Sequence, residues 1–348
     1  MKKCTKCILP ENYPGIKFNE KGICNFCLAY KKAESKGLDR LEKIFKKYRN
    51  KNKDYDCLVG ISGGRDSSYA LYYLVKKCNL RVLAYSADNG FIPMQCKINM
   101  KSMTDILNVK LIIDKHNFLT KCIKYNIQTW LRKPSPAMIP MICCGCRLGI
   151  FRGLLKCAKM YKIPLVVIGS GNPAESSKFK KEFFAVNPLG KIINAKVNKV
   201  FSFLYGYIYE IIKNPLYFLK PINTIIYLKE YFYCFHSNAI RKYFFPKQKT
   251  VRLYRYIDWN EDIILNIIKN ELSWKKSDDN SSSWRFDCLI SNLKNYILKK
   301  SVGFTEKDEM YSKMIRLGWI TREEALNRIS CENITPWNLV KKIYDDIK

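Results

Sequence analysis

The sequence predicts an α/β protein in which a doubly wound parallel sheet lies between a cysteine-rich N-terminal module and a mainly helical C-terminal region. Apolar runs typical of buried strands alternate with helical periodicity between about residues 55 and 169. Two Cys-x-x-Cys pairs precede this alternation, and long apolar, aromatic and basic stretches with few glycines follow it. These observations divide the chain into segments 1–50, 51–195 and 196–348.

The composition is that of a globular protein with real cores: 348 residues, 47% hydrophobic and 26% charged. No apolar stretch reaches the length of about 18 residues that a transmembrane helix needs, and the start of the chain lacks an apolar signal segment. We therefore expect a cytoplasmic protein. In a long chain within a reducing compartment, closely spaced cysteines favour metal binding or redox chemistry over disulfides.

The formal net charge of +32 implies attraction to polyanions such as nucleic acid, nucleotides or an anionic membrane surface. Lys, Ile and Asn are abundant throughout the chain, as a genome-wide composition bias would also produce. Much of the charge would then be solvated surface. The charge alone therefore does not identify a partner.

The N-terminal module carries two cysteine pairs, Cys4-x-x-Cys7 and Cys24-x-x-Cys27. This spacing is typical of a tetrahedral zinc site that clamps a short knuckle. Four thiolates leave the ion no open position, so the predicted role is structural. The segment has few apolar residues, and the metal would supply its stability. A charged helix is expected to follow over about residues 38–51.

The second segment opens with the apolar run 57–61, which predicts a buried strand, followed by a helix over 67–77. Further strands are expected at 81–86, 109–113 and 164–169, and helices at about 94–107, 118–131 and 146–161. Such alternation builds a parallel sheet covered by helices. Because these sheets bind ligands where their strands end, Gly169 at the end of the fourth strand is a candidate ligand contact.

A glycine loop follows the first strand directly, with Ser62, Gly63 and Gly64 before the next helix. Backbone N–H groups of such a loop can close around a phosphate while the helix N-terminus adds positive potential. The loop lacks the Gly-Lys-Ser/Thr ending of the P-loop and the spaced glycines of the dinucleotide fingerprint. The sequence therefore predicts a phosphate site of another type.

A second group of cysteines, Cys143-Cys144-Gly145-Cys146, stands just before a predicted helix whose N-terminus would lower thiol pKa values. Cys143 and Cys146 could hold an iron–sulfur cluster with a distant third ligand such as Cys234, carry sulfur, or form a redox pair. The alternatives are a second zinc pair or cysteines packed under the sheet.

Segment 196–256 interleaves Phe and Tyr with Lys and Arg. This pattern is compatible with base stacking, with peripheral membrane contact, or with a helical core that has a basic surface. The last arrangement is the most common of the three.

The loop Ser62-Gly63-Gly64-Arg65-Asp66-Ser67 resembles the Ser-Gly-Gly-x-Asp-Ser loop of the PP-loop ATP pyrophosphatase superfamily, with its adenine nucleotide alpha hydrolase-like fold. The resemblance implies that ATP, helped by Mg²⁺, adenylates an oxygen of a second substrate and releases pyrophosphate. It also implies that Asp66 and Ser67 are catalytic and contact pyrophosphate with Ser62, Gly63 and Gly64, while Ser86 and Asp88 lie near the adenosine. Arg65 stands where the family usually has Lys or a variable residue.

Both ends of the chain resemble the bacterial N-acetyl sugar amidotransferases of surface-polysaccharide (lipopolysaccharide and pseudaminic acid) biosynthesis. The matching segments are Cys4 to Glu11, Phe18 to Cys27, Tyr256 to Asn260, Leu272-x-Trp274, Trp284-Arg285-Phe286 and Ile320 to Leu326. This resemblance implies a free or nucleotide-linked N-acetyl sugar as acceptor and a partner glutaminase that supplies ammonia. It is the function that the sequence favours.

One segment departs from the sugar enzymes. Cys143-x-x-Cys146-Arg147-Leu148 is similar to the cysteine motif of tRNA 2-thiolation enzymes, which implies a [4Fe-4S] cluster or a persulfide at Cys143 and Cys146 and tRNA as the partner. Thiolation is therefore the alternative function, with Cys143 and Cys146 as catalytic residues. A third hypothesis is a nucleotide-binding scaffold without turnover.

Overall fold

The structure, a computed structural model, describes residues 1–31, 34–115, 117–169, 171–175, 208–216, 247–277, 282–334 and 336–347. Its strands are β1 (Cys57–Gly60), β2 (Val82–Asp88), β3 (Leu111–Lys115), β4 (Leu165–Ile168) and β5 (Lys249–Arg252). The α-helices up to β4 are α1 (Asn25–Leu28), α2 (Leu38–Tyr48), α3 (Arg65–Tyr72), α4 (Met94–Ile106), α5 (Asn117–Arg132) and α6 (Cys144–Met160). Those after β5 are α13 (Glu261–Leu272), α14 (Ile290–Val302), α15 (Glu306–Leu317), α16 (Arg322–Glu332) and α17 (Trp337–Ile347).

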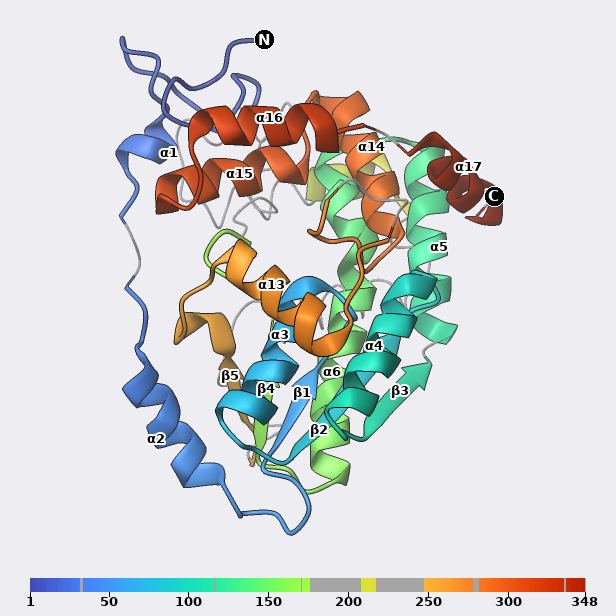
Figure 1. The fold of residues 1–348 in the computed structure, drawn as a ribbon. Coiled ribbons are helices and arrows are strands. Elements are labelled where there is room, and N and C mark those ends of the chain that lie inside the picture. Colours follow the sequence, from blue (N-terminus) through green and yellow to red (C-terminus); the bar gives the residue numbers. More distant parts are fainter. Residues whose placement is uncertain are drawn as a thin grey trace.

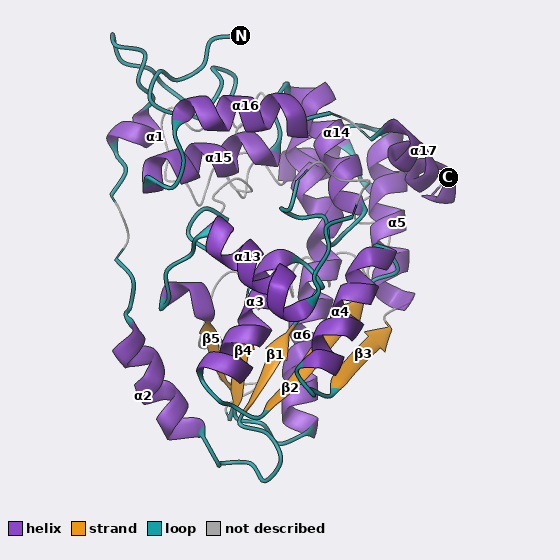
Figure 2. Cartoon of the chain, in the orientation of Figure 1, coloured by secondary structure: helices purple, strands orange, loops and turns teal. Residues whose placement is uncertain are grey.

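The five strands form one parallel sheet in the order β3-β2-β1-β4-β5 (Figure 2). Leu58 at the centre of β1 pairs with Leu83 of β2 on one side and with Val166 of β4 on the other. These strands are short, apolar and buried, as expected for the middle of a parallel sheet.

Successive side chains of each strand point to opposite faces of the sheet and pack into two different hydrophobic cores. Val59 of β1 joins the core formed with α3, α4 and α13, whereas Leu58 packs in a second core against α6. Figure 1 shows α3 and α4 on one side of the strands and α6 on the other. The chain thus changes face between β3 and β4.

This change of face makes the carboxyl end of β1 the switch point of the sheet topology. The chain runs from β1 towards β2 and β3 on one side, and returns through α6 to place β4 on the other side of β1. Ligands of doubly wound sheets bind at the carboxyl ends of the strands at such a point. The loop after β1 and the turn after β4 both lie at this point.

The C-terminal helices connect the N-terminal module to the sheet. Figure 1 shows α15 and α16 between the N-terminal loops and α13, with α14 and α17 beside α5. Ile8 belongs to the same core as α3 and α13, and Leu9 packs in the core shared by α5, α14 and α17. The cysteine module is therefore anchored by apolar packing as well as by its cysteines.

The predicted fold class is confirmed, and the first four strands lie close to their expected positions. β2 extends further than predicted, to Asp88, so Ser86 lies inside the strand. The sequence does not predict β5, because Lys-Thr-Val-Arg is mostly polar and only Val251 of this edge strand is buried. No helix among the described residues combines the length and apolar character that crossing a bilayer demands.

Candidate functional site

The turn after β1 can be formed only with glycine at position 63. Gly63 has φ +75°, and a Cβ there would lie 2.2 Å from the backbone oxygen of Cys96. Its own carbonyl accepts hydrogen bonds from the Trp274 indole (2.9 Å) and the Asn99 amide (3.2 Å). The loop is thus fixed from α4 and from the segment after α13.

The two predicted serines lie together at the start of α3. The Ser62 backbone N–H donates to Ser67 Oγ, and the two hydroxyl oxygens are 3.1 Å apart. Ser67 Oγ in turn donates to the Gly64 carbonyl at 3.1 Å. Gly64 is the N-cap and supplies no side chain, so the first N–H groups of α3 have no side-chain cap. This arrangement suits a bound anion.

Asp66 is held by hydrogen bonds from the turn after β4 and from the segment before α13. Its Oδ1 accepts from the Trp259 indole at 3.2 Å, and its Oδ2 accepts from the Asn172 amide, after β4, at 3.0 Å. The Tyr254 hydroxyl donates to its backbone carbonyl at 2.8 Å. The carboxylate is therefore oriented by groups from both sides of the phosphate loop.

Arg65, 4% exposed, holds the loop to the C-terminal helices. Its guanidinium binds Asp66 Oδ1 at 2.8 Å, forms an ion pair with Glu261 of α13, and lies 4.8 Å from the centre of the Trp259 ring. Arg328 of α16 pairs with the other oxygen of Glu261. The predicted loop residues thus lie together, and Arg65 connects them to α13 through its ion pair with Glu261.

The candidates at the end of β2 are buried, with Ser86 2% and Asp88 9% exposed. Asp88 accepts from the Gly90 backbone N–H at 2.9 Å and from Lys97 Nζ at 3.1 Å. Gly169 permits close packing, because a Cβ there would lie 2.5 Å from Ala70 Cβ and 3.1 Å from Ser67 Cα. Gly169 thus lets α3 approach the end of β4.

Three cysteines, which we call the edge cysteines, gather beyond β2: Cys143, Cys146 and Cys288. The Asn89 amide, next to Asp88, lies 3.1 Å from Cys146 Sγ and 3.9 Å from Cys288 Sγ. Cys143 and Cys288 pack against the core that contains Cys146. Burial, the nearby Cys143 and Asp287 together raise the pKa of Cys288 to about 12.

Segment 284–289 joins these cysteines to the phosphate loop. A Cβ on Gly64 would lie 3.2 Å from Asp287 Oδ2, and the next residue is Cys288. The Trp284 indole donates to Glu175 at 3.0 Å, and the Leu289 N–H donates to the Phe91 carbonyl at 2.9 Å. Sequence reasoning missed Asp287 and Cys288, although the Trp284-Arg285-Phe286 motif ends immediately before them.

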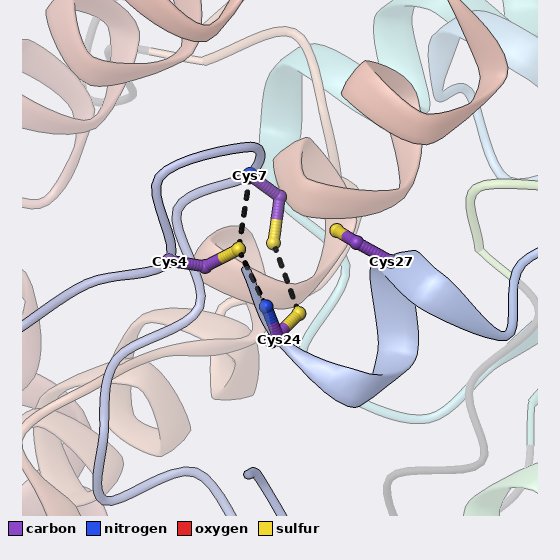
Figure 3. A group of neighbouring side chains, drawn as sticks. All are labelled: Cys4, Cys7, Cys24 and Cys27. Carbon is purple, nitrogen blue, oxygen red and sulfur yellow. Dashed lines mark hydrogen bonds between the residues drawn. The ribbon is translucent and has the colours of Figure 1, made fainter. Parts of the chain in front are cut away.

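The four cysteines of the N-terminal module converge as predicted (Figure 3). All four are buried, and their sulfur atoms lie within 4.8 Å of one another. Hydrogen bonds from Cys24 and Cys27 lower the pKa of Cys7 to about 2, with a contribution from Arg316. The donor set fits a structural zinc ion.

Two arginines attach this knuckle to the C-terminal helices. Arg316 of α15 lies 3.5 Å from Cys7 Sγ and 3.8 Å from Cys27 Sγ. Arg322 Nε donates to the carbonyls of Cys4 (3.2 Å) and Cys7 (3.1 Å). The positive charges offset the charge of a thiolate site, as partners of metal ligands commonly do.

Several residues for which the sequence makes predictions lie outside the described part of the structure. Cys234 and most of segment 196–256 lie outside the described residues, and of Cys144 and Arg147 only the backbone is described. The basic and aromatic character of segment 196–256 therefore stays a prediction.

No family model matches the chain. An uncharacterized protein of Methanocaldococcus jannaschii is 29% identical over 115 residues, which cover 32% of this chain and 42% of that relative. Among solved structures, the chain is similar to the U34-tRNA thiolase NcsA from Methanococcus maripaludis with its [4Fe-4S] cluster, with a TM-score of 0.34, 16% identity, and coverage of 94% of this chain and 89% of the other.

These comparisons overturn one prediction. The chain was expected to be an N-acetyl sugar amidotransferase supplied by a glutaminase, but a solved structure to which it is similar is that of a tRNA thiolase. Two of the edge cysteines, Cys143 and Cys146, belong to the segment that departs from the sugar enzymes.

Proposed function

We propose that the chain is a PP-loop-type ATP pyrophosphatase that transfers sulfur to a base carbonyl of tRNA. The observation that carries the proposal is the position of Cys143, Cys146 and Cys288. They gather beside Asn89 at the end of β2, and Cys288 directly follows the residue that lies against Gly64 of the phosphate loop. A thiol-bound sulfur source would thus lie next to the activated carbonyl.

The nucleotide half of the proposal rests on the loop after β1. Glycine at 63, the paired hydroxyls of Ser62 and Ser67, and the uncapped start of α3 suit a bound pyrophosphate group. The adenosine would then lie towards the end of the neighbouring strand β2, where Ser86 and Asp88 are found.

The reaction balances without an added oxidant or reductant. The base carbonyl oxygen attacks the α-phosphorus of ATP, the bond to the β-phosphate oxygen breaks, and pyrophosphate leaves. A hydrosulfide ion then attacks the activated carbon, the C–O bond breaks, and AMP departs with the former carbonyl oxygen. Loss of the sulfur-bound proton leaves the thiocarbonyl. The chain's contribution is to hold the phosphates and to place the acceptor.

The edge cysteines fit a [4Fe-4S] cluster better than a single ion. Among the described residues, only the knuckle cysteines bring three or more ligand atoms within 4.8 Å of one another. A cluster needs no such convergence, because each thiolate binds a different iron atom. When bound by three thiolates, the cluster would supply an iron atom open to sulfide. The net charge of +32 supports a polyanionic acceptor such as tRNA.

The first experiment is metal analysis of anaerobically purified protein with matched variants. We expect zinc, iron and acid-labile sulfide in the wild type, and loss of iron and sulfide but not of zinc in Cys146→Ala and Cys288→Ala. The control is Cys331→Ala, because Cys331 is an exposed cysteine on α16. Wild-type protein that contains zinc but no iron would contradict the proposal that the edge cysteines bind a cluster.

Turnover is then measured with ATP, sulfide and tRNA that lacks the thiolated base. We expect AMP and pyrophosphate in amounts equal to the thiolated base, and none of these products with Asp66→Ala. Release of ADP would contradict the adenylation chemistry. ATP binding without AMP release in the presence of tRNA would instead favour a nucleotide-binding scaffold.

A further inference from the structure

Most carboxylates around the phosphate loop are already occupied by donors. Asp66 accepts from Arg65, Trp259 and Asn172. Both oxygens of Glu175 also accept hydrogen bonds, one from the Trp284 indole and one from the Gly171 N–H, each at 3.0 Å. Occupied carboxylates of this kind orient the loop, and they have little capacity left for a cation.

Asp287 differs from these carboxylates. It is partly exposed, and it accepts no hydrogen bond from any residue that the structure describes. Its charge contributes to the raised pKa values of Cys96 and Cys288, and together with Glu306 and Glu175 it raises the pKa of the nearby Arg285. It is thus a carboxylate at the loop to which no described residue donates a hydrogen bond.

The position of Asp287 is defined by Gly64. A Cβ on Gly64 would lie 3.2 Å from Asp287 Oδ2 and 3.3 Å from Ser62 Oγ. A carboxylate and a hydroxyl therefore approach the same point of the loop, where the N–H groups of α3 begin.

A carboxylate at this point opposes the binding of a triphosphate, because like charges would meet beside an anion site. A divalent cation between them reverses the sign of the interaction. Mg²⁺ is bound in proteins by one or two carboxylates together with substrate phosphates, and in phosphate loops by a hydroxyl. Asp287 and Ser62 supply both ligand types.

We infer that Asp287, with Ser62 Oγ beside it, binds the Mg²⁺ that accompanies ATP, and that Asp66 orients the loop instead. The inference rests on the nucleotide site proposed above. It assigns the cation to the segment that also carries Cys288, so the metal-bound phosphates and the edge cysteines would be held by one stretch of chain.

The test compares ATP binding with Mg²⁺ and with EDTA by calorimetry, using non-hydrolysable ATP. For the wild type we expect Mg²⁺ to tighten binding at least about tenfold, as removal of a like-charge repulsion predicts. Asp287→Asn should bind the metal-free nucleotide more tightly than the wild type and lose the Mg²⁺ effect. Asp345→Asn, at an exposed position on α17, is the matched control and should behave as the wild type.

Asp66→Asn sharpens the assignment, because it should weaken both forms of the nucleotide alike and keep the Mg²⁺ effect. Paramagnetic resonance of Mn²⁺ with the nucleotide gives a second readout, which should change in Asp287→Asn and not in Asp66→Asn. An undiminished Mg²⁺ effect in Asp287→Asn would overturn the inference. Failure of the wild type to bind either form of the nucleotide would overturn the proposed nucleotide site itself.

Discussion

The protein contains two groups of cysteines that differ in how they are built. The knuckle sulfurs all lie within 4.8 Å of one another in buried positions, and Arg316 approaches two of them from α15. The sulfur atoms of the three edge cysteines do not all lie within this distance of one another. Cys143 and Cys288 are also partly exposed. Convergence with burial is typical of a structural ion, whereas wider spacing with access is typical of a reactive site.

Removal of a knuckle ligand tests this comparison with the largest effect. Cys7→Ala should abolish zinc binding and lower the free energy of unfolding by about 4 kcal/mol or more, because metal loss is among the most damaging single changes. Cys146→Ala should lose iron and leave the unfolding free energy within about 1 kcal/mol of wild type when both proteins are compared without a cluster. Chemical denaturation with metal analysis measures both. Equal destabilisation by the two variants would remove the distinction.

Glycines in the two regions provide a second comparison. Gly63 and Gly15 have nearly the same φ, +75° and +74°, but a Cβ meets the Cys96 backbone at position 63 and nothing within 4 Å at position 15. Gly63→Ala should therefore lower stability by about 3 kcal/mol and prevent nucleotide binding, whereas Gly15→Ala should lower stability by about 1 kcal/mol. Thermal unfolding and calorimetry check the pair. A Gly63→Ala protein that still binds ATP would show that the loop has another conformation.

Glu261 tests how the loop is anchored. Burial opposes its ionisation, but the nearby Arg65 and Arg328 outweigh burial and lower its pKa. Because the pKa of Glu261 is lower in the folded state, its ionised form stabilises the protein at pH values above the unfolded-state pKa of about 4.3. This stabilisation is lost as the pH falls through the folded-state pKa. Glu261→Gln should thus lower stability by about 2 kcal/mol at pH 7, and the difference from wild type should shrink below about pH 4. A difference that does not change with pH would exclude the ion pairs as its cause.

The sequence predicted those parts of the molecule that depend on local pattern. Apolar runs revealed β1 to β4, and the spacing of Cys4, Cys7, Cys24 and Cys27 revealed the knuckle. β5 was missed because an edge strand with one buried residue has no apolar run. The glycine loop lies directly after β1 as predicted, but the ion pair of Arg65 was not predicted, because its partner Glu261 is far away in the sequence.

The third edge cysteine shows the same limit. Cys143 and Cys146 stand close together in the sequence, so their pairing was expected. Cys288 comes from a distant segment, and it joins them only because residues 284–289 cross the end of the sheet from the phosphate loop to Asn89. No spacing rule identifies such a residue, and Cys234 was an equally reasonable candidate from the sequence.

The smallest expected effect concerns the arginines around the knuckle. Arg316 contacts the sulfur atoms of Cys7 and Cys27, whereas Arg322 contacts the carbonyls of Cys4 and Cys7. Loss of a partner of metal ligands typically weakens metal affinity by about 10- to 100-fold, so Arg316→Met should weaken zinc binding by at least about tenfold. Arg322→Met should change zinc affinity less, since it leaves the sulfur contacts intact. Competition with a zinc chelator measures both, and equal losses would indicate that the arginines act by docking the knuckle rather than by balancing thiolate charge.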